Sequence, residues 1–139
     1  MRVVLDSNVL IAALVTRGGC AELFEHVLAN HTFGVDENLL GEVERVLRDK
    51  IRIPEEPLHG FIQLLRDHGK LTDPEALQLP VSRDPDDDRI LALCLAFEAG
   101  ALVTGDADLL VLDPWNDLRI LRPRDFWPFE RTSGGPTER

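Results

Sequence analysis

The chain has 139 residues, of which 44% are hydrophobic, and a formal net charge of -10. This size and composition suit one globular domain whose core needs no disulfide bonds. The two cysteines, Cys20 and Cys94, lack the CxxC spacing of a zinc or redox motif, and they indicate reduced thiols in a cytoplasmic protein. The acidic balance argues against a nucleic-acid partner, because phosphate binding commonly leaves a basic footprint.

The sequence offers no membrane-spanning segment. The apolar run from Val9 to Val15 is far shorter than the roughly 20 residues that a span requires. The N-terminus also lacks the pattern of a signal peptide. We therefore expect no contact with a membrane.

Strand-like and helix-like apolar patterns alternate along the chain. In chain order they predict a strand at 3–5, helices at 9–14 and 21–28, a strand at 32–35, a helix from about 37 to 47, a helix at 58–65, a strand fragment and loop at 70–80, a helix at 85–99, and strands at 101–104 and 118–121. Strands separated by helices indicate an α/β fold with a mainly parallel sheet and helices on both of its faces.

Local signals mark the ends of several of these elements. Asp36 suits the N-cap of the helix that follows it, and Asp84 with Pro85 suits the start of the helix at 85–99. That last helix is apolar nearly all round, so it lies either inside the core or in the interface of an oligomer. No internal repeat or linker is visible, and we expect one domain over 1–129 and a disordered tail over 130–139.

Acidic residues are expected to gather at one edge of the sheet. Asp6 follows the first strand, Asp106 follows a later one, and Asp87 lies in the first turn of a helix that should begin nearby. Loops converge at the carboxyl ends of parallel strands, and ligands bind there. Glu42 flanks the apolar stripe of its own helix and can join these acids.

Such a cluster indicates divalent cations. Carboxylates about 4 Å apart repel by roughly 4 kcal/mol per pair at an effective dielectric of about 20, which a marginally stable domain cannot keep without compensation. Hard ions with oxygen ligands, Mg²⁺ or Mn²⁺, supply it, and they also convert an acidic surface into a phosphate-binding one. A basic patch for an RNA backbone would be formed by Arg45, Arg48, Lys50 and Arg52.

Each acid also has a purely structural interpretation. Asp6 suits a turn after a strand, Asp87 suits a helix start, and Asp106 suits a helix cap. Glu42 competes with Glu44, because both lie at the border of the same apolar stripe. At each of these positions a functional role and a purely structural role are therefore both open.

The remaining polar candidates also have both a functional and a structural interpretation. Ser7, Asn8 and Thr104 could orient carboxylates by hydrogen bonding, although strand ends are rich in such residues. Asp108 could be an additional ligand or a solvated acid, and the basic patch could be an ordinary solvated helix face. The four histidines show no ligand spacing, so we expect them at ordinary surface or core positions: His26, His31, His59 and His68.

Four segments together resemble the PIN-domain family: Val-Leu-Asp6-Ser-Asn8-Val-Leu-Ile, Glu42 with Val46-Leu47, Asp84-Pro-Asp-Asp87, and Leu-Val-Thr104-Gly-Asp106-Ala-Asp108-Leu-Leu. The resemblance is ordered and spans roughly residues 1–127. It is greatest to the bacterial and archaeal VapC-like branch, described as toxin components of type II toxin–antitoxin pairs.

The resemblance implies a three-layer Rossmann-like fold, Mg²⁺- or Mn²⁺-dependent endoribonuclease activity, a homodimer and a cognate antitoxin that covers the site. Carried over by position, the family's acids fall on Asp6, Glu42, Asp87 and Asp106, with Asp108 as an auxiliary acid. The expected reaction is hydrolysis of an RNA phosphodiester to a 5′-phosphate and a 3′-hydroxyl.

Other functions at such a sheet edge fit less well. A phosphotransfer receiver needs an early acidic pair and a late lysine, and a haloacid-dehalogenase-type phosphatase needs Asp-x-Asp where this chain has Asp6-Ser7-Asn8. No glycine-rich phosphate loop is present. The main alternative is a catalytically silent protein-interaction or RNA-binding module of the same fold.

Overall fold

A computed structural model describes residues 1–75, 81 and 83–133. Five parallel strands form one sheet in the order β3-β2-β1-β4-β5, which confirms the predicted parallel sheet. The strands are β1 (Arg2–Leu5), β2 (Thr32–Val35), β3 (Lys70–Leu71), β4 (Ala101–Val103) and β5 (Arg119–Leu121). Val3 to Leu5 of β1 are at most 1% exposed, which explains why this strand is an uninterrupted apolar run.

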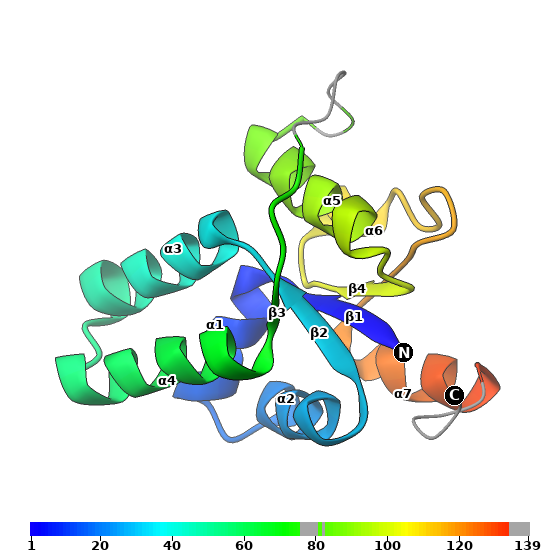
Figure 1. Ribbon diagram of the computed structural model, residues 1–139. Coiled ribbons are helices and arrows are strands. Elements are labelled where there is room, and N and C mark those ends of the chain that lie inside the picture. The colour runs from blue at the N-terminus through cyan, green and yellow to red at the C-terminus, as the bar shows by residue number, and fades with distance from the viewer. Residues whose placement is uncertain (76–80, 82, 134–139) are drawn as a thin grey trace.

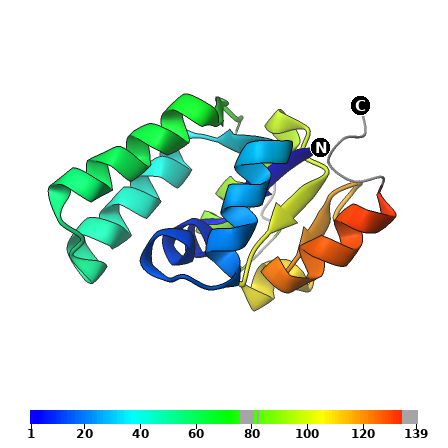
Figure 2. The same cartoon turned by 90° about the horizontal axis from the view of Figure 1, so that it is seen from below.

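Helices cover both faces of the sheet, as the sequence predicts. They are α1 (Ser7–Val15), α2 (Gly19–Asn30), α3 (Glu37–Arg45), the π-helix η1 (Val46–Ile51), α4 (Glu55–His68), α5 (Pro85–Phe97), α6 (Ala107–Leu110) and α7 (Pro123–Thr132). Helix α5 lies on one face, and α2 and α7 lie on the other (Figures 1 and 2). The fold is therefore three-layered.

Aromatic side chains show how closely the layers approach β2. The ring of Phe97, from α5, lies so near Gly34 that a Cβ there would come within 2.6 Å of it. On the other face, Phe33 meets Phe24 of α2 with ring centroids 6.2 Å apart. Gly34 is therefore required by the close packing of α5, since a larger side chain would push this helix off the sheet.

Helix α5 is a core helix. Leu91, Leu93 and Phe97 are at most 1% exposed, whereas Leu95 is 46% exposed. The chain therefore buries most of this apolar helix by itself, and no second subunit is needed to cover it.

The C-terminal helix departs from the sequence expectation. No helix was expected after Pro123, yet α7 extends to Thr132 and so includes three residues assigned to the tail. Its apolar face packs against the sheet, with Phe126 fully buried, and Glu130 is 6% exposed. The rest of the expected tail, 134–139, and the loop residues 76–80 and 82 lie outside the described residues.

Within the described part of the chain, no helix combines the length and apolar character needed to cross a bilayer.

Candidate active site

Asp6 lies at the centre of the carboxyl edge, the edge of the sheet at which the parallel strands end. It directly follows β1, caps α1, and is 8% exposed. Its Oδ1 accepts a hydrogen bond from the Ser7 backbone N–H at 2.8 Å, and its Oδ2 accepts from the Thr104 hydroxyl at 2.7 Å and the Asn8 amide at 3.2 Å. These donors hold the carboxylate in one orientation at the strand end.

The pKa of Asp6 is raised above its ordinary value. Burial is the main cause, and the charges of Glu42 and Asp106 raise the pKa further, while the hydrogen bonds from Thr104 and Ser7 oppose the shift. Asp6 is thus a buried acid beside two other acids, an arrangement that favours a bound cation.

Glu42 reaches this edge from α3. The Ser7 hydroxyl donates to Glu42 Oε2 at 2.9 Å, so α1 and α3 meet at these two side chains. Glu44 instead pairs with Arg48 at 2.8 Å on the exposed side of the helix. The structure therefore resolves the choice between the two glutamates in favour of Glu42 as the one at the acidic edge.

The residues after β4 are linked to those after β1. Asn8 Oδ1 accepts from the Gly105 N–H at 3.1 Å, and the Thr104 hydroxyl accepts from the Asp106 N–H at 3.0 Å. Because Thr104 also donates to Asp6, one hydroxyl bridges the two strand ends. Ser7, Asn8 and Thr104 thus all contact the acidic edge, as the sequence suggested.

Asp87, Asp106 and Asp108 form the other half of the edge. Each offers a carboxylate oxygen, and these oxygens lie within 4.8 Å of one another. Asp87 is 6% exposed, although it occupies the first turn of α5, where a merely capping acid would normally be solvated. Its burial beside Asp106 is the observation that distinguishes it from an ordinary helix-start residue.

The acids adjacent to Asp87 in the sequence are not part of this group of three carboxylates. Asp86 is exposed and pairs with Arg89 at 3.1 Å, and Asp88 Oδ1 accepts from the Val81 N–H at 3.1 Å. Asp108 also pairs with Arg83 at 2.6 Å. The structure therefore places Asp87 in the cluster, in agreement with the position carried over from the family resemblance.

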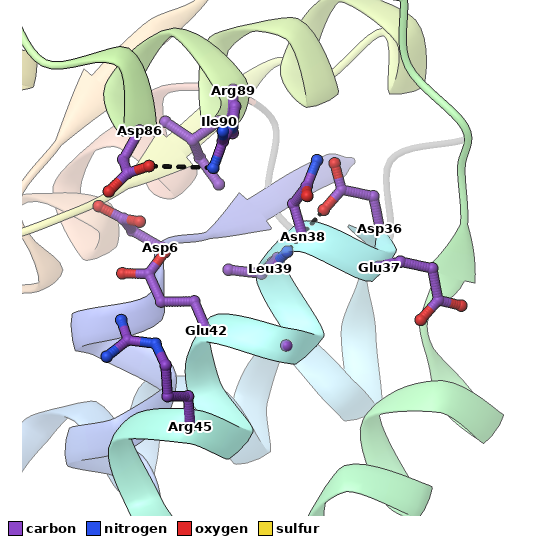
Figure 3. A pocket seen from close by; sticks show the side chains of 11 residues that line it. Asp6, Asp36, Glu37, Asn38, Leu39, Glu42, Arg45, Asp86, Arg89 and Ile90 are labelled. Atoms are coloured by element: carbon purple, nitrogen blue, oxygen red, sulfur yellow. Dashed lines mark hydrogen bonds and ion pairs between the residues drawn. The ribbon is translucent and has the colours of Figure 1, made fainter. Parts of the chain in front are cut away.

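A cavity of about 350 Å³ opens between α3 and α5. Figure 3 shows Asp6 and Glu42 on one side of it, with Asp86 and Arg89 of α5 opposite and Arg45 below. Sequence reasoning missed Arg89 and Asp86 as lining residues. The available signal was the position of Arg89 in α5, one helical turn after Asp86.

The expected basic patch is divided by the structure. Arg45 lines the acidic cavity, whereas Arg48 is neutralised by Glu44 and Glu55, each at 2.8 Å. Lys50 and Arg52 belong to η1 and its C-cap, and neither lines this cavity. Arg48 and Lys50 lie in the π-helix η1, which helical periodicity in the sequence does not predict.

The donor set fits a hard divalent cation. All five acids supply carboxylate oxygens, the ligands that Mg²⁺ and Mn²⁺ prefer. Asp87, Asp106 and Asp108 bring carboxylate oxygens within 4.8 Å of one another, and Asp6 is buried beside Glu42 and Asp106, so a cation would offset the repulsion among these groups. The residues present therefore fit such an ion.

Fold and site together define an α/β protein whose parallel sheet presents clustered carboxylates at its carboxyl edge. The family model described as a PIN domain matches residues 2–108, most of the chain, and the protein belongs to the PIN-domain family.

Among solved structures, the fold is similar to one in the crystal structure of VapBC2 from Rickettsia felis bound to a DNA fragment from their promoter. The TM-score is 0.59 at 16% sequence identity, and the match covers 86% of this chain and 97% of the other. No curated protein matches the sequence.

Proposed function

We propose that this protein is a divalent-metal-dependent endoribonuclease and the toxin component of a toxin–antitoxin pair. The observation that carries the proposal is the meeting of Asp6, Glu42, Asp87 and Asp106 at one edge of the sheet, from four elements distant in the sequence. Membership of the PIN-domain family supports it. The likeness to the VapBC2 structure adds support for the fold.

Asp6, Asp87 and Asp106 would hold a Mg²⁺ or Mn²⁺ ion, with Asp108 as an auxiliary ligand, and Glu42 would hold a second ion or orient the attacking water. A bound divalent ion supplies a nucleophile from water at neutral pH and stabilises the leaving oxygen. Thr104, Ser7 and Asn8 fix the directions of the carboxylates by the hydrogen bonds described above.

The substrate is an RNA phosphodiester. Arg45 and Arg89 line the same cavity as Asp6 and Glu42, and their guanidinium groups could hold phosphates next to the acids. Divalent ions held by the acids, together with these two arginines, would answer the objection raised by the overall charge of -10. We place the enzyme in the cytoplasm, as a homodimer whose site a cognate antitoxin covers, because the family resemblance implies this. Light scattering would test the homodimer. Copurification with the neighbouring gene product would test the antitoxin.

The decisive experiment is cleavage of an end-labelled structured RNA by purified protein with Mn²⁺. We expect cleavage that leaves 5′-phosphate and 3′-hydroxyl ends, stops with EDTA, and is lost in Asp6→Asn and Asp106→Asn. Asp67→Asn is the matched control, because Asp67 is exposed on α4 and contacts only Gln63 in the described hydrogen bonds. Folded protein that binds a partner but cuts no RNA with either metal would instead indicate a silent interaction module.

A further inference from the structure

A second cluster of ligand-type side chains lies at the opposite edge of the sheet. His31 directly precedes β2, His26 lies on α2, and Glu130 comes from α7, so the cluster lies at the amino end of β2. The acidic site follows the carboxyl ends of β1 and β4. The two clusters therefore belong to different edges of the molecule.

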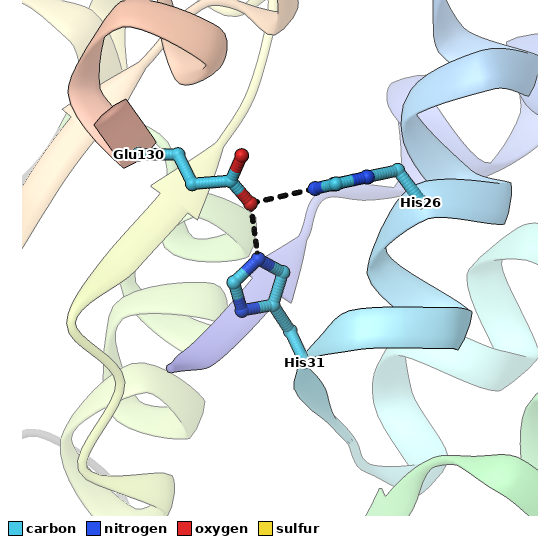
Figure 4. Close-up of side chains that lie close together, drawn as sticks. All are labelled: His26, His31 and Glu130. Atoms are coloured by element: carbon cyan, nitrogen blue, oxygen red, sulfur yellow. Dashed lines mark hydrogen bonds and ion pairs between the residues drawn. The ribbon is translucent and has the colours of Figure 1, made fainter. Parts of the chain in front are cut away.

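The three side chains converge on one point. His26 Nε2 lies 2.6 Å from Glu130 Oε2, and His31 Nε2 lies 2.5 Å from the same oxygen. Figure 4 shows both rings turned so that this nitrogen faces the carboxylate. One ligand atom from each residue falls within 4.8 Å of the others.

The cluster is largely buried, and its carboxylate contacts only the two histidines among charged groups of the described residues. The Glu130 side chain is 8% exposed and the His31 side chain 0%, and no arginine or lysine pairs with Glu130 in the described part of the chain. Burial lowers the pKa of His31, and the two histidines lower the pKa of Glu130 against the effect of its own burial. The N-terminal amino group and His26 also lower the pKa of His31, while Glu130 raises it.

The second ring nitrogens of the two histidines, which face away from Glu130, differ in their surroundings. His31 Nδ1 is buried and has no hydrogen-bond partner among the described residues. The His26 Nδ1 contacts the Asn30 side-chain amide at 3.2 Å, which fixes that ring from behind. Phe126 meets His31 edge to face, with ring centroids 5.7 Å apart, and Trp127 lies tilted against His26, with ring centroids 4.8 Å apart.

From these observations we propose that His26, His31 and Glu130 form a transition-metal site of the Zn²⁺ class, separate from the acidic site. Two imidazoles and one carboxylate are a donor set that Zn²⁺ uses, with a fourth position left for water. The His26 side chain is 24% exposed, so an ion and its water can reach the cluster.

The required rearrangement is small. Tetrahedral Zn²⁺ with bonds of about 2.0–2.1 Å separates its ligand atoms by about 3.3 Å. The nitrogen–oxygen distances of 2.6 Å and 2.5 Å must therefore open by less than about 1 Å, which a change in the Glu130 side-chain torsions provides. The bound ion would fasten α7 to α2 and to the start of β2.

The test is calorimetric titration of metal-free protein with Zn²⁺, in parallel with thermal unfolding. Zn²⁺ can also enter the acidic site, so the titrations use an Asp106→Asn background, in which that site is impaired. We expect one equivalent to bind and to raise the melting temperature. His26→Gln and Glu130→Gln should weaken this binding by at least about tenfold.

His68→Gln is the matched control, because His68 is an exposed histidine at the end of α4. Circular dichroism of each metal-free variant establishes that it is folded, and His26→Gln, at the more exposed ligand, keeps the test usable if Glu130→Gln does not fold. Equal Zn²⁺ binding by His26→Gln and His68→Gln would refute the proposed metal site. The three side chains would then only hydrogen-bond to one another. This outcome is independent of whether the acidic site cuts RNA.

Discussion

The Thr104 hydroxyl bridges two neighbouring parallel strands, since it donates to Asp6 across 98 positions of the chain and accepts from the backbone of Asp106. Thr104→Val keeps the shape of the side chain but removes both of these hydrogen bonds. Because Thr104 is fully buried, we expect a loss of about 1–3 kcal/mol in the free energy of unfolding.

The same variant should alter the pH dependence of cleavage. The Thr104 hydrogen bond lowers the pKa of Asp6, so its removal lets that pKa rise further. The acidic limb of the activity profile should therefore move to higher pH. Thr104→Ser, which keeps the hydroxyl, is the control, and an unchanged limb in Thr104→Val would contradict the role given to this contact.

Asp6 should make the metal-free protein less stable as pH rises. Its folded pKa is above its ordinary value, mainly through burial, so the folded state holds the proton more tightly than the unfolded state. The stabilising effect of the protonated form is present below the ordinary pKa and is lost as pH rises through the folded pKa. The measurement is the difference in unfolding free energy between wild type and Asp6→Asn in EDTA, from about pH 3 to pH 7. A difference that grows in favour of wild type with pH would refute the direction of this shift.

Mn²⁺ should stabilise the protein through Asp87. An ion that binds only the folded state at about 100 times its Kd adds about 2.7 kcal/mol. We expect Asp87→Asn to lose this gain and the cleavage activity, whereas Asp67→Asn keeps both. Normal activity with a normal metal requirement in Asp87→Asn would mean that Asp87 serves only the start of α5.

Arg45 and Arg48 should differ in their effect on RNA. Arg45 lines the acidic cavity, and Arg48 is occupied by Glu44 and Glu55. Arg45→Ala should therefore weaken RNA binding more than Arg48→Ala and reduce the salt slope by about one unit, as expected for a lost phosphate contact. Filter binding of Asp6→Asn protein at several salt concentrations measures both effects, and equal losses in the two variants would contradict the assignment.

Gly34 should not tolerate a side chain. A Cβ at this position would come 2.6 Å from the Phe97 ring in a packed layer. Gly34→Ala should cost about 1–3 kcal/mol in the free energy of unfolding, as overpacking does. Gly60→Ala is the control, because nothing lies within 4 Å of its Cβ and alanine favours its helix α4. Denaturant unfolding of the two variants should give effects of opposite sign.

Local patterns predicted much of the fold. The apolar run at 3–5 became part of β1 because strands buried on both faces need apolar side chains throughout, and the strand predicted at 32–35 is β2. Asp36 and Asp84 cap α3 and α5 as expected, since capping is an interaction between near neighbours. Helix α7 was not predicted, although Pro123 suits a first helical turn.

The sequence itself determined which side chains follow the strands. A parallel α/β sheet with Asp6 and Asp106 at its carboxyl edge follows from patterns of a few residues. Tertiary structure alone decided between Glu42 and Glu44, separated Arg45 from Arg48, and joined His26, His31 and Glu130. Two of these choices depend on long-range contacts: Ser7–Glu42 spans 35 positions, and the two histidine contacts of Glu130 span 104 and 99. Contacts at such separations leave no periodic trace in the chain.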